Sequence, residues 1–158
     1  MPFPPQDHDH GTCVARAMEA AEAQCRDRGA RLTDIRRRVL ELIWTSHAPV
    51  GAYGLLEVLG REGRAAAPPT VYRALDFLLA HGLIHRIETM NAFIGCSHPG
   101  VPHSGLFLVC DGCGTVAELV ESDVASAVES GAARMGFTVE TLTMEAKGKC
   151  PECRAASS

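Results

Sequence analysis

Apolar residues in the first half of the chain recur every three to four positions, a spacing that places them on one face of a helix. The spacing predicts four helices, over residues 12–28, 33–44, 52–60 and 69–81. Thr33 is a suitable N-cap for the second helix, and the pair Pro68–Pro69 opens the fourth, which ends at Gly82. Two short strands follow, over residues 83–88 and 92–96. Helices followed by a β-hairpin are the order of a winged-helix domain, although other small α+β domains share it.

Beyond residue 96 the pattern changes to a loop rich in Gly, Pro, His and Ser, followed by short strands and one helix. These elements are predicted over residues 106–109, 115–120, 122–135 and 137–146, with Ser122 as the N-cap of the helix. The sequence therefore predicts an α+β fold with two domains. The predicted division is a disordered leader (1–11), a winged-helix domain (12–90), a hinge loop (91–105) and a small C-terminal α/β domain (106–158).

Charge is distributed unevenly between the two parts of the chain. The net charge of −4 excludes a uniformly basic nucleic-acid binder. Residues 1–90 nevertheless carry 11 Arg against 11 acidic residues, whereas residues 91–158 carry 4 basic against 8 acidic residues. A neutral first domain can still present a basic face to DNA, because local clustering decides the field.

The sequence predicts a cytoplasmic protein without a membrane partner. Residues 1–12 lack the apolar segment of a secretory signal, and no apolar run approaches the roughly 18 residues that span a membrane. The seven cysteines are then expected in a reducing compartment. There they are interpreted as metal ligands or free thiols and not as disulfides.

Two Cys-x-x-Cys pairs form the strongest motif. Cys110 and Cys113 flank a tight turn that contains Gly112, and Cys150 and Cys153 repeat the spacing near the C-terminus. Each pair lets two thiolates grip one tetrahedral ion, and four thiolates are the usual structural zinc site. Such an ion would join the two ends of the second domain, and the alternative is four unrelated buried cysteines.

A second, looser set of ligand types spans both domains. It comprises His85, Cys96, His103 and Glu118, with His98 nearby. Mixed His, Cys and carboxylate ligands suit zinc, and a site drawn from both domains would let metal binding set the angle between them. Each residue alone has an ordinary alternative as a surface His, a free Cys or a solvated Glu.

Three further residues of ligand type lie in or beside the leader: His8, His10 and Cys13. Because the leader is predicted to be disordered, chance or adventitious binding is the favoured interpretation. We assign these residues no role.

The fourth helix carries the residues expected to contact DNA. Val71, Leu75 and Leu78 share a face that must pack on the core. Arg73 follows Val71 by two residues, so at about 100° per residue it lies on the other side of the helix and points outward. Thr70 and Tyr72 flank Arg73, and Tyr53 opens the third helix. An outward Arg near the start of a helix in the major groove is the usual reader of guanine. Arginines 31 and 36–38 are candidate phosphate contacts, and solvated helix faces are the alternative.

The run PPTVYRALDFLLAHGLIHRIE (Pro68–Glu88), the segment Ala52–Leu56 and the two Cys-x-x-Cys pairs together resemble the ferric uptake regulator family, especially its zinc uptake regulators. The resemblance covers about residues 15–153. It implies a metal-loaded homodimer that represses zinc uptake genes from palindromic operators, with the second domain dimerising. It further implies that this is not an enzyme and has no small-molecule substrate.

The resemblance also implies two zinc ions per subunit and a role for each motif. The structural ion is assigned to Cys110, Cys113, Cys150 and Cys153, and the regulatory ion to His85, Cys96, His103 and Glu118. Base contacts are assigned to Tyr53 and Arg73, while Thr70 and Tyr72 complete the DNA-binding set. Iron-sensing relatives carry a His-rich run before the first Cys pair and a His on the late strand. Neither is present in that form here, which favours zinc.

Two rival functions come from other classes of protein. A zinc-dependent nucleobase deaminase also uses a Cys-x-x-Cys element, but it needs a His-x-Glu motif that this chain lacks. A metal-storage protein or metallochaperone would not need an outward Arg on a proline-capped helix before a hairpin. Zinc-dependent binding to a palindromic duplex would separate a repressor from both.

Overall fold

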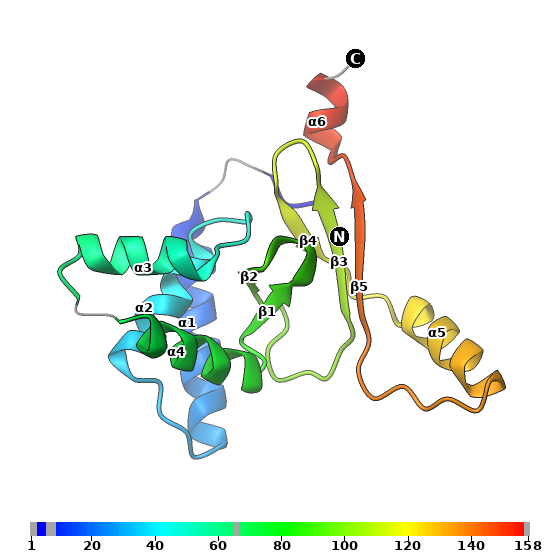
Figure 1. The fold of residues 1–158 in the computed structure, drawn as a ribbon, viewed down its shortest axis with the longest axis horizontal. Helices are drawn as coiled ribbons and strands as arrows, with labels where there is room; N and C mark the ends of the chain where they lie inside the picture. The colour runs from blue at the N-terminus through cyan, green and yellow to red at the C-terminus, as the bar shows by residue number, and fades with distance from the viewer. Residues whose placement is uncertain (1–2, 6–8, 65–66, 157–158) are drawn as a thin grey trace.

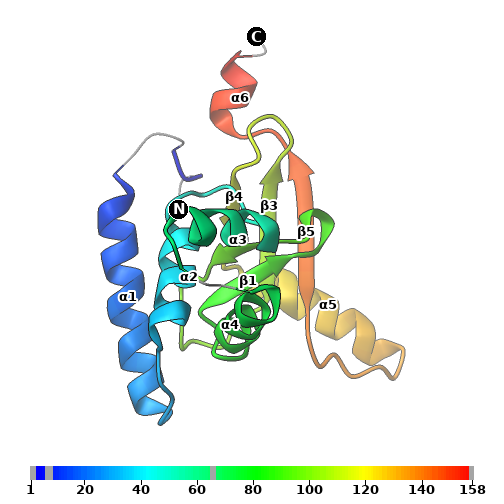
Figure 2. The same cartoon turned by 60° about the vertical axis from the view of Figure 1, so that its left-hand side comes forward.

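The computed structural model of the protein describes residues 3–5, 9–64 and 67–156. Its N-terminal part gathers four helices beside a two-stranded hairpin (Figures 1 and 2). The helices are α1 (His10–Asp27), α2 (Asp34–Trp44), α3 (Ala52–Arg61) and α4 (Pro68–Ala80). The hairpin consists of β1 (Ile84–Ile87), a short 3-10 helix η1 (Glu88–Met90) and β2 (Ala92–Gly95). This is the winged-helix order that the sequence predicts.

The apolar faces of these helices form the larger core. Its fully buried side chains include Val39, Ile43, Leu55, Leu59 and Leu75. They recur at helical spacing, so each helix buries one stripe and leaves the opposite face to solvent. Removing a large side chain from such a core costs about 2–5 kcal/mol. This packing fixes α4 and its outward residues relative to the hairpin.

The hairpin of β1 and β2 is the wing, and its strands pair antiparallel, with Ile84 opposite Gly95 and Ile87 opposite Ala92. Gly95 is required by space, because a Cβ atom there would lie 2.1 Å from the ring of Trp44. The wing is thereby held against the end of α2. It brings His85 on β1 and Cys96 just after β2 toward the second domain.

The second domain is a three-stranded sheet with the strand order β4-β3-β5. Its strands are β3 (Gly105–Cys110), β4 (Val116–Glu118) and β5 (Thr143–Gly148), and its helices are α5 (Ser122–Arg134) and α6 (Pro151–Ala156). β3 and β4 form an antiparallel pair, whereas β3 and β5 run parallel. In Figures 1 and 2, α5 projects away from the sheet, and α6 follows the end of β5. Together with the winged helix, this confirms the predicted α+β fold class.

The wing and the sheet share a second, smaller apolar core. It joins Ile87 and Ile94 of the wing to Phe107, Val109 and Val116 of the sheet. Hydrogen bonds reinforce this contact, because the amide of Val116 donates to the carbonyl of His47 at 3.0 Å. The carboxylate of Glu145 on β5 also accepts the backbone N–H of Glu88 at 2.6 Å. The two parts of the chain are therefore directly packed.

Several predicted boundaries differ from the structure. Helix α1 begins at His10, inside the predicted leader, because the side chain of Asp9 accepts the Gly11 amide and caps the helix. Residues 1, 2 and 6–8, including His8, lie outside the described residues. The division at residue 90 separates two paired strands, so β2 goes with the wing and the connection runs over 96–104. The last strand is predicted from residue 137 but begins at Thr143, and Glu121, not Ser122, occupies the N-cap position of α5, without a capping hydrogen bond from its side chain.

None of the helices among the described residues is both long and apolar enough to cross a membrane.

Candidate metal centres and nucleic-acid interface

The four cysteines of the two Cys-x-x-Cys pairs come together at one end of the sheet. Cys110 ends β3, and Cys150 follows the parallel strand β5 and precedes α6. Their four sulfur atoms all lie within 4.8 Å of one another, and the Sγ atoms of Cys113 and Cys150 are 3.8 Å apart. Parallel pairing of β3 and β5 therefore brings the two pairs together.

The backbone around the sulfurs suits four thiolates. The amide of Cys150 donates to Sγ of Cys110 at 3.2 Å, and the amide of Cys153 donates to Sγ of Cys150 at 3.4 Å. Gly112 leaves room for this approach, because a Cβ atom there would lie 2.7 Å from Sγ of Cys153. The closed set of four sulfur donors fits a tetrahedral structural zinc ion.

The acidities of these thiols depend on the same contacts. The backbone N–H groups of Cys150 and Cys113 lower the pKa of Cys110 to about 6. The neighbouring sulfur of Cys150, together with partial burial, raises the pKa of Cys153 to about 12. Thiolates this close repel one another, and a divalent cation bound among them would remove that repulsion.

The second candidate site lies where the wing meets the sheet. His85 comes from β1, Cys96 follows β2, His103 lies in the connection, and Glu118 ends β4. One ligand atom from each lies within 4.8 Å of all the others. Oε1 of Glu118 is 2.8 Å from Nε2 of His85 and 2.5 Å from Nε2 of His103. Sγ of Cys96 is 3.6 Å from the same nitrogen of His103.

A hydrogen bond and burial hold these ligands in place. Nδ1 of His103 lies 2.6 Å from the carbonyl of Val101 and donates to it, which leaves the lone pair of Nε2 facing Glu118. Both Glu118 and Cys96 are nearly excluded from solvent, at 3% of the side chain and 2% of the residue respectively. Two imidazoles, one thiol and one carboxylate form the mixed donor set that suits zinc.

Burial and hydrogen bonding set the charges at this site. Burial opposes ionisation of Glu118, but hydrogen bonds from His85 and Ser97 outweigh it and lower the pKa to about 2. Burial, and then the nearby charge of Glu118, raise the pKa of Cys96 to about 12. Cys96 is therefore a neutral thiol at pH 7, and binding of a cation there must displace its proton.

The remaining ligand types do not join either group. His98 lies 6.3 Å from His103, measured between ring centroids, and its Nδ1 is 2.9 Å from the hydroxyl of Ser97. The rings of His10 and His47 are 5.0 Å apart. Among the described residues, these three histidines and Cys13 belong to no cluster of three or more ligands. Ser97, which contacts Glu118, was not singled out by the sequence; its position directly after Cys96 is the only signal.

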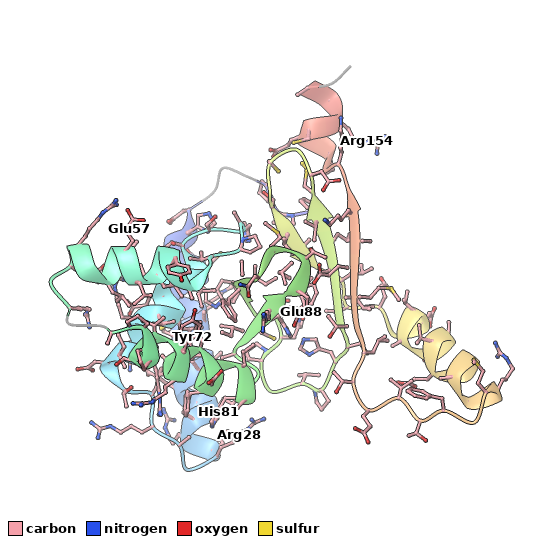
Figure 3. All side chains as sticks on the ribbon, viewed as in Figure 1. Arg28, Glu57, Tyr72, His81, Glu88 and Arg154 are labelled. Carbon is pink, nitrogen blue, oxygen red and sulfur yellow. The ribbon has the colours of Figure 1, made fainter. Side chains whose placement is uncertain are left out.

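The predicted DNA-facing residues lie on the start of α3 and the first turns of α4. Val71, Ala74, Leu75 and Leu78 are buried, while Arg73 is exposed on the opposite face of α4. Tyr72, labelled in Figure 3, is also exposed, and Thr70 is half-buried. Tyr53 is 84% exposed. The amide of Thr70 already bonds the carbonyl of Ala67. Accessible polar side chains thus surround the helix start.

Three of the arginines considered as phosphate contacts have partners within the chain. Arg37 pairs with Glu22, and Arg38 pairs with Glu62 and Glu41. Arg36 lies over the ring of Phe77, 3.7 Å from its centroid. These contacts fasten α2 to its neighbours, which is a structural use of the cluster.

Comparison with known proteins gives a consistent result. The model of the ferric uptake regulator family matches residues 27–147. The zinc uptake regulation protein of Escherichia coli (strain K12) is 38% identical over 143 residues, which cover 90% of this chain and 84% of that protein.

Solved structures are similar in both sequence and fold. A zinc uptake regulator complexed with zinc and DNA superposes with a TM-score of 0.84 at 36% identity, covering 96% of this chain and 99% of that one. Holo XcZur gives a TM-score of 0.82 at 47% identity, covering 90% and 99%. Apo XcZur gives 0.52 at 46% identity, covering 89% and 97%.

Proposed function

We propose a mechanism for this chain, which belongs to the ferric uptake regulator family and works as a zinc-responsive repressor of zinc uptake. Double-stranded DNA is its partner, and zinc is its metal. The observation that carries the mechanism is the group formed by His85, Cys96, His103 and Glu118. Its ligands come from the wing, the connection and the sheet, so one ion held there would link a DNA-binding domain to its neighbour.

We assign two zinc ions to each chain. The four cysteines would hold a structural ion that joins the ends of β3 and β5. The mixed group would hold a regulatory ion, which when bound supplies a redox-inactive cross-link between its ligands. The burial of Glu118 and Cys96 and the fixed ring of His103 favour this second assignment.

The two domains would respond to the metal through their shared interface. His85 lies in the wing, Cys96 directly follows it, and Glu118 belongs to the sheet, so ligation would hold α4, the helix with the proposed DNA contacts, in one orientation. The higher TM-score with the holo form of XcZur than with its apo form supports a closed arrangement of this kind. Without ligation, the residues 96–104 would let the domains separate, and only a fraction of molecules would fit an operator.

We further propose that the protein binds palindromic operators as a homodimer through its second domain. Helix α5 projects from the sheet, and none of its described side chains is buried. Apolar side chains are exposed close by, including Met135 at 86% and Phe137 at 66%. An isolated domain rarely leaves such side chains in water, so a second copy is the expected cover.

The exposed aromatic of this face offers a test of the dimer. Phe137→Asp should weaken dimerisation by about 2 kcal/mol or more, because a central aromatic of an interface would be replaced by a charge. Analytical ultracentrifugation would measure the dissociation constant. Tyr53→Asp is the matched control, since it alters an exposed aromatic of the first domain. If both variants dimerised like the wild type, the interface would lie on another face.

Arg73 offers a test of sequence reading. Arg73→Ala should cost about 1–3 kcal/mol in operator binding and relax specificity at one base of each half-site. Binding would be measured at fixed salt on operators altered one base at a time. Arg16→Ala, an exposed arginine of α1 that belongs neither to the DNA-binding set nor to the proposed dimer face, should leave binding unchanged. Equal weakening on every duplex would instead make Arg73 a phosphate contact.

The rival functions are separated by one experiment. A gel-shift against the DNA upstream of zinc-transport genes should show binding that zinc strengthens and a chelator abolishes. A storage protein or a zinc enzyme would bind metal without this DNA response. The chain matches the ferric uptake regulator family over residues 27–147, and four sulfur donors leave no position for a reactive water. Because a repressor acts on the chromosome, we place the protein in the cytoplasm.

A further inference from the structure

The two oxygens of Glu118 face different partners. Oε1 points at the histidines of the mixed group, at 2.8 Å from His85 and 2.5 Å from His103. Oε2 points away from them and accepts two hydrogen bonds from Ser97. The backbone N–H of Ser97 donates at 3.0 Å, and its hydroxyl donates at 2.6 Å. Because the carboxylate is 3% exposed, water has little access to replace either bond.

Ser97 stands at the point where the wing ends. The residue before it, Cys96, is tied to the wing by a hydrogen bond from its amide to the carbonyl of Leu83 at 3.0 Å. Ser97 therefore reaches from the end of β2 to the end of β4, across the boundary between the domains. Two donors from one residue fix both the position of the carboxylate and its rotation.

This arrangement decides how many oxygens Glu118 can offer to a cation. With Oε2 committed to two donors, only Oε1 is directed toward His85, Cys96 and His103. The group then supplies four donors, which matches the tetrahedral preference of zinc. A carboxylate free to rotate could offer both oxygens, as larger oxygen-preferring cations favour.

We propose that Ser97 is a positioning residue of the regulatory site, which holds Oε2 of Glu118 so that the carboxylate offers Oε1 alone. This rests on the proposed function, in which His85, Cys96, His103 and Glu118 bind zinc. The consequence is a site assembled before metal arrives, with higher zinc affinity and a preference for four-coordinate ions. Partners of this kind typically contribute 10–100-fold in metal affinity.

The test compares three full-length variants with the wild type, each holding its four-cysteine zinc. Ser97→Ala removes the hydroxyl bond and keeps the amide bond, and Ser97→Thr keeps both donors. Ser104→Ala is the matched control, because Ser104 lies in the same connection but, among the described residues, makes no hydrogen bond to Glu118. Chelator competition gives the affinity for the second zinc ion, and Co²⁺ placed in the same site reports coordination number through its visible absorption. Circular dichroism and thermal melting verify that each variant is folded.

We expect Ser97→Ala to bind the second zinc ion about 10–100-fold more weakly. Its Co²⁺ spectrum should lose intensity, as it does when a fifth donor joins a tetrahedral ion. Ser97→Thr and Ser104→Ala should match the wild type in both measurements. Unchanged affinity and spectrum in Ser97→Ala would overturn the role of Ser97 but leave the proposed function standing. Failure of the wild type to bind a second ion at all would overturn the proposed function, and this proposal with it.

Discussion

Replacing Cys113 by Ser should unfold the second domain and dissociate the dimer. The apolar core that this domain shares with the wing is small, with only Phe107, Val109 and Val116 contributed by the sheet among the described residues. β5 is exposed along most of its length, so few side chains hold it against β3. A structural zinc ion can supply about 10–16 kcal/mol of apparent folding free energy, more than such a core.

The effect would be measured as zinc content, thermal unfolding and sedimentation on one preparation. Cys13→Ser is the control, because it removes a thiol that belongs to neither ligand group and should leave all three measurements unchanged. The winged helix has its own core and is expected to keep its helical signal. A folded, dimeric Cys113→Ser protein that lacks the ion would refute the structural assignment.

The second large effect is expected at the mixed site. Cys96→Ser and His103→Ala should each keep a folded dimer with its four-cysteine ion but lose the second one. Operator affinity should then no longer rise on addition of zinc, a loss of about 1–3 kcal/mol of coupling. The reason is that ligation across the wing and the sheet would select one domain arrangement, and either change breaks that link.

Metal content and operator binding must be measured on the same preparations, with Cys13→Ser again as the control. If Cys96→Ser and His103→Ala both retained full zinc-dependent binding, the sensing ligands would lie elsewhere. His98 and the pair of His10 and His47 would then be the next residues to test.

Elements with a strong apolar period were predictable from the sequence. In α2, the stripe through Val39, Leu42 and Ile43 is buried as expected, and α4 begins at its two prolines. Residues 137–142 alternate in polarity and so predict an early start for the last strand, but in the structure they lie outside β5, and the sequence does not predict α6. Alternation reports local character, whereas strand order depends on partners that are remote in sequence, so the parallel pairing of β3 with β5 was beyond reach.

The two ligand groups differed in predictability for the same reason. Each Cys-x-x-Cys pair is a local motif, and its chemistry is visible within four residues. The mixed group draws single residues from three segments, and no local pattern connects His85 to Glu118. The family resemblance suggested that set, and the packing of wing against sheet brings its atoms within 4.8 Å. The hydrogen bonds of Ser97 depend on that packing, so the sequence does not predict them.

The arginines of α2 show what charge composition leaves open, because both phosphate contacts and solvated helix faces are compatible with it. A run of like charges suggested phosphate contacts, but Arg37 and Arg38 form ion pairs with acidic residues on other helices or the next turn. Charge composition alone cannot distinguish a basic face from a set of internal pairs. The side chains that remain directed at solvent on α4, above all Arg73, are the better candidates for DNA.

The central claim is that zinc at the mixed site and DNA at α4 select the same closed arrangement of the two domains. If so, the coupling must be reciprocal, because each ligand favours the state that the other binds. The direct test is the affinity of the wild-type dimer for its second zinc ion, measured by chelator competition with and without saturating operator duplex. We predict that the operator tightens zinc binding by about 5–150-fold, taken over both mixed sites of the dimer. Zinc should tighten operator binding by the same overall factor. An identical zinc affinity with and without the operator would contradict the account.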